Sequence, residues 1–347
     1  MRESLKVESE RLVRSWMQHD AAKLRDYLVS SVEDPRINIQ SILSRHFLLT
    51  AVYGDNFARL MQEELRFGAA MNCLCHMVEQ LGDQSDLEAV LYALRHDADN
   101  ADGIVIPGFV LQTFRSLEST GGAPATPNYV ETFLDRTDFI DGKPVISAKA
   151  LDTFQQLWQH LLSSSPTVQG EHLPPRVLEA ACGSANDYRF LVSCGIAPLL
   201  EYRGFDLCAR NIENARALFP ESHFIEGNVF AIDAADRSFD LCFAHDLFEH
   251  LSLEGLEAAI NEVCRVTRKA LCFGFFQMDE RPEHVVRPVD DYHWNLLSLA
   301  KTRASFAQHG FLGQCIHIAS LLRQQFECDY THNPNAYTLI FSRQRDR

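Results

Sequence analysis

The chain has 347 residues, of which 46% are apolar, so it can bury a core and wholesale disorder is excluded. Its 47 acidic and 32 basic side chains give a net charge of −15, which repels phosphates and disfavours a nucleic-acid partner. No apolar run reaches the roughly 18 residues of a membrane-spanning helix. The ten scattered cysteines and the lack of an apolar secretory segment at the N-terminus predict a cytoplasmic protein with reduced thiols.

The first hundred residues show helical periodicity and no strand alternation. Helices are predicted over residues 4–30, after Pro35 through residues 46–53, over 55–81, and from the N-cap Ser85 to about Arg95. We therefore predict an all-α N-terminal domain over residues 1–125. It matches no fold that we can name, and we interpret it as a lid over an active site, a homodimer contact, or both.

Strand and helix patterns alternate after a Gly- and Pro-rich linker at 118–128 and a helix predicted over 147–162. Strands are predicted at 177–180, 202–205, 223–226, 239–244 and 270–276, helices at 209–218 and 256–266, and two final strands at 311–318 and 336–341 that could pair antiparallel at the sheet edge. Such alternation favours a parallel sheet covered by helices on both faces. We predict an α/β domain over residues 126–347, with its Rossmann-like core at 176–347.

Small residues follow the first of these strands. The segment 176–187 reads RVLEAACGSAND: a buried strand, a turn of small residues and the start of a helix. Small residues let a ligand approach the backbone, and the start of a helix offers free N–H groups. Asp206 closes the next strand, where a carboxylate can accept hydrogen bonds from both ribose hydroxyls of a nucleoside. A Rossmann dehydrogenase would show GxGxxG instead, and that motif is absent.

This segment resembles motif I of the class I S-adenosylmethionine-dependent methyltransferases, usually E-x-G-x-G-x-G. Here Glu179 and Gly183 match, while Ala181 and Ala185 replace the first and third glycines. Alanine fits there if the backbone needs no positive φ. Three further segments follow in the order typical of this family, namely EGNVF at 226–230, FDLCFAHDLFEHL at 239–251 and ALCFGFF at 270–276.

The resemblance covers roughly residues 176–347 and is of the methyltransferase type 11 and type 25 kind. It implies a Rossmann-like seven-stranded sheet, S-adenosylmethionine as cofactor and S-adenosylhomocysteine as product. The residues that it implies for cofactor binding are Glu179, Ala181, Gly183, Asp206, Leu207, Asn228, Val229 and His245.

Methyl transfer from a sulfonium is an in-line displacement, and a histidine is the usual base where the acceptor must lose a proton. His293, in the loop DDYHWN after the strand 270–276, and His250 are the candidate catalytic residues. The candidate substrate contacts are Tyr292 and Trp294 in the same loop and Tyr129 in the segment that leads into the core.

The spacing of Asp246, Glu249 and His250 resembles the E-x-x-E-H metal motif of certain methyltransferases. Two carboxylates and an imidazole could hold a divalent cation. The first residue is one methylene shorter here, and the same letters occur in metal-free relatives. We therefore predict no metal and keep the three residues as candidates only.

The sequence thus predicts a methyltransferase that acts on the oxygen, nitrogen or carbon of a small-molecule acceptor. The alternatives are an enzyme that methylates a protein or an RNA end, and a non-catalytic protein that binds S-adenosylmethionine.

Overall fold

The computed structural model describes residues 1–17, 38–81, 100–101, 104–116, 138–140, 143–145, 155, 158–159, 162, 173–331 and 333–344. The predicted helix 85–95, the linker 118–128, most of the helix 147–162 and Tyr129 lie outside these residues. In the described part of the chain, no helix is long and apolar enough to cross a membrane.

A seven-stranded sheet forms the centre of the molecule, in the order β14-β15-β9-β8-β5-β6-β7. Its strands are β5 (Arg176–Ala180), β6 (Glu201–Asp206), β7 (His223–Glu226), β8 (Phe239–His245), β9 (Thr267–Phe275), β14 (Phe311–His317) and β15 (Tyr337–Arg343). The first five are parallel, and β15 runs antiparallel between β9 and β14. The predicted seven-stranded Rossmann-like sheet with an antiparallel edge pair is confirmed.

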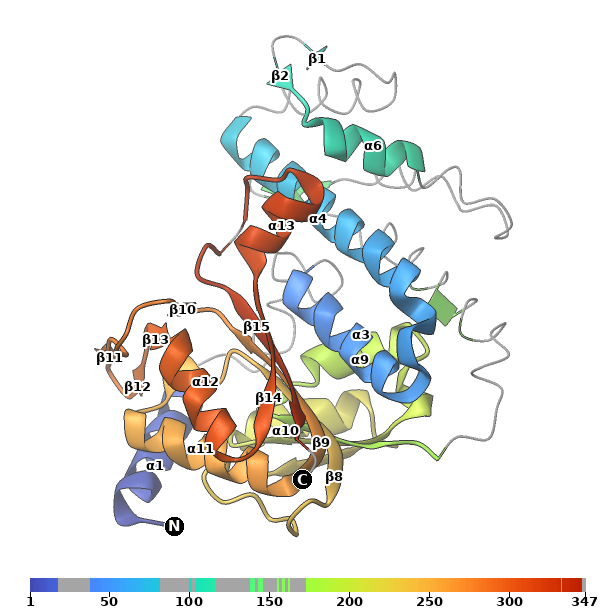
Figure 1. The fold of residues 1–347 in the computed structure, drawn as a ribbon. Coiled ribbons are helices and arrows are strands. Elements are labelled where there is room, and N and C mark those ends of the chain that lie inside the picture. The colour runs from blue at the N-terminus through green and yellow to red at the C-terminus, as the bar shows by residue number, and fades with distance from the viewer. Residues whose placement is uncertain are drawn as a thin grey trace.

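Helices cover both faces of this sheet (Figure 1). On one side lie α3 (Ile39–Tyr53), α4 (Ala58–Leu81), α9 (Asn186–Ser193), α10 (Ala209–Leu218) and α13 (Ile318–Phe326), and on the other α1 (Glu3–Met17), α11 (Leu253–Val266) and α12 (Leu299–Gln308). Val177 and its neighbour Leu178 show the division, because successive side chains of a strand point to opposite faces and these two join different clusters. With both faces covered, β8 is buried from Phe239 to Ala244.

The N-terminal helices lie on opposite faces of the sheet in the described part of the chain. The side chains of Leu5 and Leu12 in α1 join the cluster beneath α11, whereas α3 packs on the other face, against β8, β9 and β15. Helix α3 lies in the region predicted to be helical after Pro35, and it begins at Ile39 because the Asn38 side chain accepts hydrogen bonds from the amides of Gln40 and Ser41. The boundary near residue 125 and the homodimer contact stay predictions.

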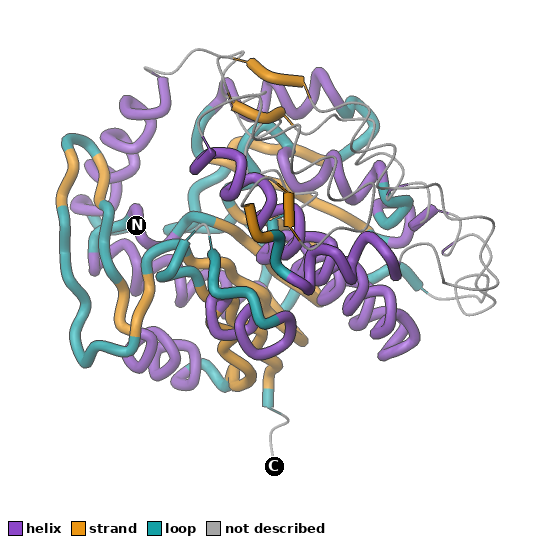
Figure 2. The backbone as a smooth tube through the Cα atoms, turned by 90° about the horizontal axis from the view of Figure 1, so that it is seen from above, coloured by secondary structure: helices purple, strands orange, loops and turns teal. Residues whose placement is uncertain are grey.

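Short elements complete the fold. They are η1 (Gly54–Phe57), η2 (Ala197–Leu199), η3 (Phe248–His250), α6 (Gly108–Ser116), β1 (Asn100–Ala101), β2 (Ile104–Val105), β3 (Asp138–Ile140), β4 (Lys143–Val145), β10 (Met278–Asp279), β11 (Pro288–Val289), β12 (Tyr292–His293) and β13 (Leu297–Ser298). The β1–β2 hairpin corrects the prediction that residues 1–125 are purely helical, because a two-residue strand is too short to show alternation. Figure 2 shows the segment that carries β11 and β12 as a long loop at one end of the molecule.

Candidate functional site

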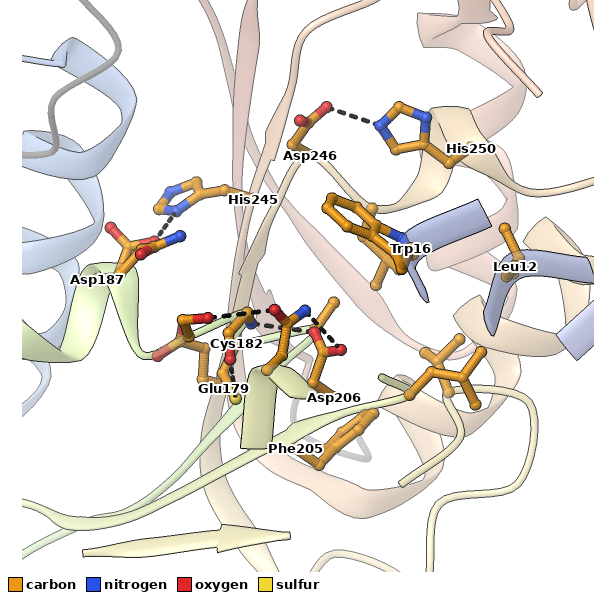
Figure 3. Close-up of a pocket in the computed structure, with 18 of the residues that line it drawn as sticks. Leu12, Trp16, Glu179, Cys182, Asp187, Phe205, Asp206, His245, Asp246 and His250 are labelled. Atoms are coloured by element: carbon orange, nitrogen blue, oxygen red, sulfur yellow. Dashed lines mark hydrogen bonds and ion pairs between the residues drawn. The ribbon is translucent and has the colours of Figure 1, made fainter. Parts of the chain in front are cut away.

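A cavity opens at the carboxyl ends of β5, β6 and β8, where the strand order reverses and where ligands bind in such sheets. Its volume is about 1360 Å³ including the open mouth, which is ample for a nucleoside with a second moiety attached. The helices α1 and α3 supply part of its wall, through Leu12 and Trp16 and through Asn38, Gln40 and Ser41. Figure 3 shows Trp16 and Leu12 on the side of the cavity opposite Asp187 and His245.

The loop after β5 holds three residues in the left-handed region, with φ of 58° at Ala181, 54° at Gly183 and 66° at Ala185. We expected Ala181 and Ala185 to fit only if the backbone needs no positive φ, and this condition is not met. Both alanines adopt a positive φ, which costs about 1 kcal/mol of strain each. Hydrogen bonds hold the strained turn, because the amide of Cys182 donates to the carbonyl of Phe205 over 3.0 Å. The loop keeps the shape typical of a glycine-rich turn although two of its glycines are replaced.

Asp206 lies at the end of β6 and is buried, with 8% exposure. One of its oxygens accepts from the amide of Gly183 over 3.0 Å, and the other accepts from the amide of Cys208 over 2.8 Å and from Asn211 over 3.0 Å. Burial raises the pKa of this carboxyl group, and the three donors partly offset the rise. These bonds aim the carboxylate at the cavity beside the left-handed loop.

Glu179 lies below the loop and lines the cavity at 3% exposure. The hydroxyl of Tyr202 donates to it over 2.6 Å. Burial, and then the negative charge of Asp187, hold the pKa of Glu179 well above its usual value. Burial and the bond from Tyr202 hold the Glu179 side chain in place in the cavity wall.

Beyond β7, Asn228 and Val229 line the cavity together with Leu207. The Asn228 amide nitrogen donates to the hydroxyl of Ser9 in α1 over 2.7 Å, and its oxygen accepts from the amide of Phe230 over 2.9 Å. The loop and the first helix are therefore joined at this end of the cavity.

His245 ends β8 and lines the opposite end of the cavity. Its Nδ1 lies 2.9 Å from the Asp187 carboxylate and its Nε2 lies 2.6 Å from the Ser44 hydroxyl. Burial, the largest single effect, lowers the pKa of His245, but the charge of Asp187, the hydrogen bond to it and the charge of Asp246 together raise the pKa. The structure thus brings His245 to the cavity wall with both nitrogens held by protein groups.

Asp246 and His250 form a second pair on the same wall, with Asp246 Oδ1 3.1 Å from His250 Nε2. Asp246 has a strained φ of 51°, and the other ring nitrogen of His250 donates to the carbonyl of His293 over 3.1 Å. Burial would lower the pKa of His250, but the bond to Asp246 raises it to about 9. A pKa of about 9 favours the protonated ring at neutral pH, and the catalytic role of His250 stays a prediction.

The third member of the metal motif, Glu249, is bonded elsewhere. The Glu249 side chain is fully buried and accepts from the amide of Phe276 over 2.6 Å, and burial raises its pKa to about 7. In the described ranges, no group of three His, Cys, Asp or Glu residues is arranged to hold a metal ion. The D-x-x-E-H spacing therefore corresponds here to an aspartate–histidine pair and a separate buried glutamate.

The loop with Tyr292, His293 and Trp294 lies behind His250. The rings of Tyr292 and Trp294 lie 5.6 and 5.0 Å from the His250 ring, and the three residues are absent from the cavity lining among the described residues. The Nδ1 atom of His293 is buried. The structure therefore brings this loop to His250 and not to the cavity itself, so direct substrate contact by these residues stays a prediction.

Sequence reasoning missed the contributions of α1 and α3. Leu12 and Trp16 lie within the helix predicted over residues 4–30, to which no individual site residue was assigned. Asn38 before an apolar run was also a helix N-cap signal. Neither signal shows which part of the sheet a helix will cover.

Residues 177–270 match the model of a methyltransferase domain. A comparison with curated proteins gives no match.

Similar solved structures include an S-adenosylmethionine-dependent methyltransferase from Mesorhizobium loti, at 14% identity and a TM-score of 0.39 over 52% of this chain and 100% of the other. A second is 1,6-didemethyltoxoflavin-N1-methyltransferase from Burkholderia thailandensis, at 12% identity and a TM-score of 0.38 over 55% of this chain and 76% of the other. A third is the [4+2]-cyclase SpnF, at 13% identity and a TM-score of 0.39 over 56% of this chain and 81% of the other.

The fold assignment depends on the strand order and on the matched domain rather than on these scores. The chain therefore carries the core of a class I methyltransferase, the class whose methyl donor is S-adenosylmethionine.

Proposed function

We propose that this protein transfers the methyl group of S-adenosylmethionine to a small-molecule acceptor. The observation that carries the proposal is the cavity at the carboxyl ends of β5, β6 and β8, in which a buried carboxylate faces a left-handed loop of small residues. This arrangement suits a nucleoside. A carboxylate can accept hydrogen bonds from both ribose hydroxyls, and small residues let the rest of the ligand approach the backbone closely.

The residues present fit the donor. Asp206 would hold the ribose hydroxyls, and Asn228 and Val229 would face the adenine ring. Gly183 would let a ligand approach the backbone. A Cβ atom built on Gly183 would meet only the Asn186 amide nitrogen, at 3.4 Å, so protein atoms do not fill the space beside this glycine. When bound, S-adenosylmethionine supplies a methyl group that is already activated on a sulfonium.

The acceptor side is formed by Asp246 and His250, with apolar surface from Leu12, Trp16 and Phe276. His250 remains protonated and holds one carboxylate oxygen of Asp246. Among the described residues no group bonds the second oxygen, which can therefore accept the proton of an acceptor N–H or O–H group. The same walls exclude water and align the acceptor for in-line displacement.

A small acceptor is supported by the helix α1, which narrows this side of the cavity, and by the net charge of −15, which disfavours RNA. The proposed methylated atom is an oxygen, a nitrogen or a carbon of the acceptor. The cytoplasmic location stays a prediction.

The donor assignment is tested by calorimetric titration with S-adenosylhomocysteine. We expect the native chain to bind and Asp206→Asn to bind at least about 100-fold more weakly, because two charge-assisted hydrogen bonds to ribose are lost. The exposed Glu201→Gln, which removes only a surface ion pair with Arg176, is the control and should bind normally. Equal affinity in Asp206→Asn would falsify the assignment.

A further inference from the structure

Three polar side chains from distant parts of the chain form one line of hydrogen bonds beside the cavity. Ser44 lies in α3, Asp187 in the first turn of α9 and His245 at the end of β8. Ser44 Oγ is 2.6 Å from His245 Nε2, and Asp187 Oδ2 is 2.9 Å from His245 Nδ1. Figure 3 shows the His245 imidazole directed at Asp187 across the cavity wall. Both ring nitrogens are therefore engaged by the protein.

The hydrogen bonds of Ser44 determine where the protons lie. Its hydroxyl donates to the Gln40 carbonyl one turn earlier, over 3.1 Å. A hydroxyl has one proton, so with that proton directed at Gln40 the oxygen that faces His245 is an acceptor, and Nε2 then carries a hydrogen. The Asp187 carboxylate is also an acceptor, so Nδ1 carries a hydrogen as well. The ring is then an imidazolium cation.

The charged groups around the ring agree with this proton count. The carboxylates of Asp187, from α9, and Asp246, from the end of β8, raise the pKa of His245, and the guanidinium of Arg45 in α3 lowers it by less. From β9, the Cys272 sulfur lies 3.6 Å from Ser44 Oγ, and burial raises the pKa of this thiol to about 12, so it adds no charge. The charges around the ring therefore favour the imidazolium form.

Packing also fixes the position of the ring. A Cβ atom on Gly274 would lie 2.5 Å from His245 Cδ2 and 3.0 Å from the Gln40 amide nitrogen, so the imidazole lies directly on the backbone of β9. The Gln40 side chain donates to the carbonyl of Tyr337 over 2.8 Å, which anchors the start of α3 to the sheet. The ring and the helix that holds it thus share one rigid support.

The strand order indicates which part of the cofactor this cation faces. The ribose would lie at the end of β6 and the adenine beyond β7, both on one side of β5. The rest of the molecule then extends to the other side of β5, toward β8 and α3. That part carries both a carboxylate and an ammonium group, and a fixed cation and the start of α3 both attract the carboxylate.

We propose that Ser44 is a positioning residue for the cofactor: through its hydroxyl, α3 holds His245 as a fixed cation beside the amino-acid end of S-adenosylmethionine. The inference rests on the proposed function of the cavity. It makes an N-terminal helix outside the matched domain a part of the cofactor site.

The test compares Ser44→Ala with the native chain by titration with S-adenosylhomocysteine and by nitrogen NMR of the histidine rings. We expect about tenfold weaker binding, which corresponds to the loss of one charge-assisted contact. We also expect a lower pKa for His245, an effect that a merely structural role for Ser44 would not produce. The matched control is Ser193→Ala, whose hydroxyl bonds the Arg189 carbonyl one turn earlier in α9 and should change neither quantity.

A second variant, His245→Gln, can still donate to Ser44 but carries no charge, so it should weaken binding by a similar factor even if Ser44→Ala folds poorly. The proposal is overturned if native His245 has a bare nitrogen at pH 7, or if Ser44→Ala binds S-adenosylhomocysteine as tightly as the native chain. If the native chain fails to bind at all while His245 is doubly protonated, the proposed function itself is wrong, and the role of Ser44 in cofactor binding is lost with it.

Discussion

The two histidine–aspartate pairs at the end of β8 contain the same residue types but are built differently. His245 and Asp187 are 58 residues apart, and their side chains are 12% and 19% exposed. Asp246 and His250 are four residues apart, with side chains 40% and 18% exposed. The first pair needs a strand, a helix and α3 to come together, whereas the second forms within one turn.

The difference separates the two sides of the proposed reaction. The buried pair, supported by α3 and β9, is suited to hold a cofactor that is the same in every turnover. The more exposed pair leaves a carboxylate oxygen facing the cavity and is suited to meet an acceptor. The aspartate beside each ring raises the pKa of that histidine. The predicted cofactor contact of His245 and the predicted catalytic role of His250 both stay predictions.

The largest effect is expected at the exposed pair. In Asp246→Asn, methyl transfer should fall by about 100-fold, because the proton acceptor is lost, while affinity for S-adenosylhomocysteine stays within about twofold. Turnover is measured as S-adenosylhomocysteine released with a panel of small amines and phenols that support activity in the native chain. Asparagine tolerates the positive φ of 51°, so the backbone should be unchanged.

The control for this variant is Asp290→Asn, which changes another aspartate of positive φ, 47°, that is exposed and lies outside the cavity lining. It should leave turnover unchanged. Full activity in Asp246→Asn would remove the distinction between the two pairs, because the exposed carboxylate would then have no chemical role.

The second prediction concerns pH. The folded pKa of His250, about 9, lies above its ordinary value of 6.5, so its contribution to stability is complete below pH 6.5 and is lost as the pH rises through 9. We expect the free energy of unfolding of the native chain, relative to His250→Asn, to fall by about 2 kcal/mol between pH 6 and pH 9.5, after allowance for solvent screening at Asp246. Urea unfolding at the two pH values measures this difference.

Asp246→Asn should remove most of the same pH dependence, because it removes the charge that raises the pKa. If the difference between the native chain and His250→Asn is constant from pH 6 to pH 9.5, His250 is not held as a cation in the folded protein. The two pairs would then differ in charge as well as in construction.

The smallest effect is expected in the loop between the two sides. Ala181→Gly should raise the free energy of unfolding by about 0.5–1 kcal/mol, because glycine adopts the observed φ of 58° without strain. In the helix interior of α11, Ala258→Gly should lower it by about 1 kcal/mol. Denaturant titration of both variants checks the sign, and a loss of stability in Ala181→Gly would show that the left-handed turn costs nothing here.

The donor side was largely predictable, because its residues come from one stretch in which strands, turns and helices alternate at regular spacing. Asp206 lies at the end of its predicted strand, and Asn228 and Val229 line the cavity as expected. The positive φ of Ala181 and Ala185 was not predictable, since alanine gives no local signal for that conformation. It is imposed by hydrogen bonds from β6 and by the adjacent helix.

The acceptor side was less predictable. His293 follows β9 in the sequence as an acceptor loop should, yet its loop folds back behind His250, where the His293 carbonyl accepts a hydrogen bond from that ring. Trp16 and Ser44 precede the matched domain by more than a hundred residues, and their sequence neighbours predict only amphipathic helices. Whether a buried histidine is a base or a cation depends on its partners in space.

By itself, the sequence determined the order of strands and helices, the place of the proposed nucleoside site and Asp206 as its candidate acidic residue, because these follow from periodicity and from turns that are local in the chain. Only the tertiary structure decided what surrounds that site. Helices α1 and α3 bury their apolar faces on opposite sides of the sheet. The hydrophobic effect is not directional, so an apolar helix face in the sequence does not show which face of the sheet it will cover. The charge of His245 and the strain at Ala181 are consequences of that packing.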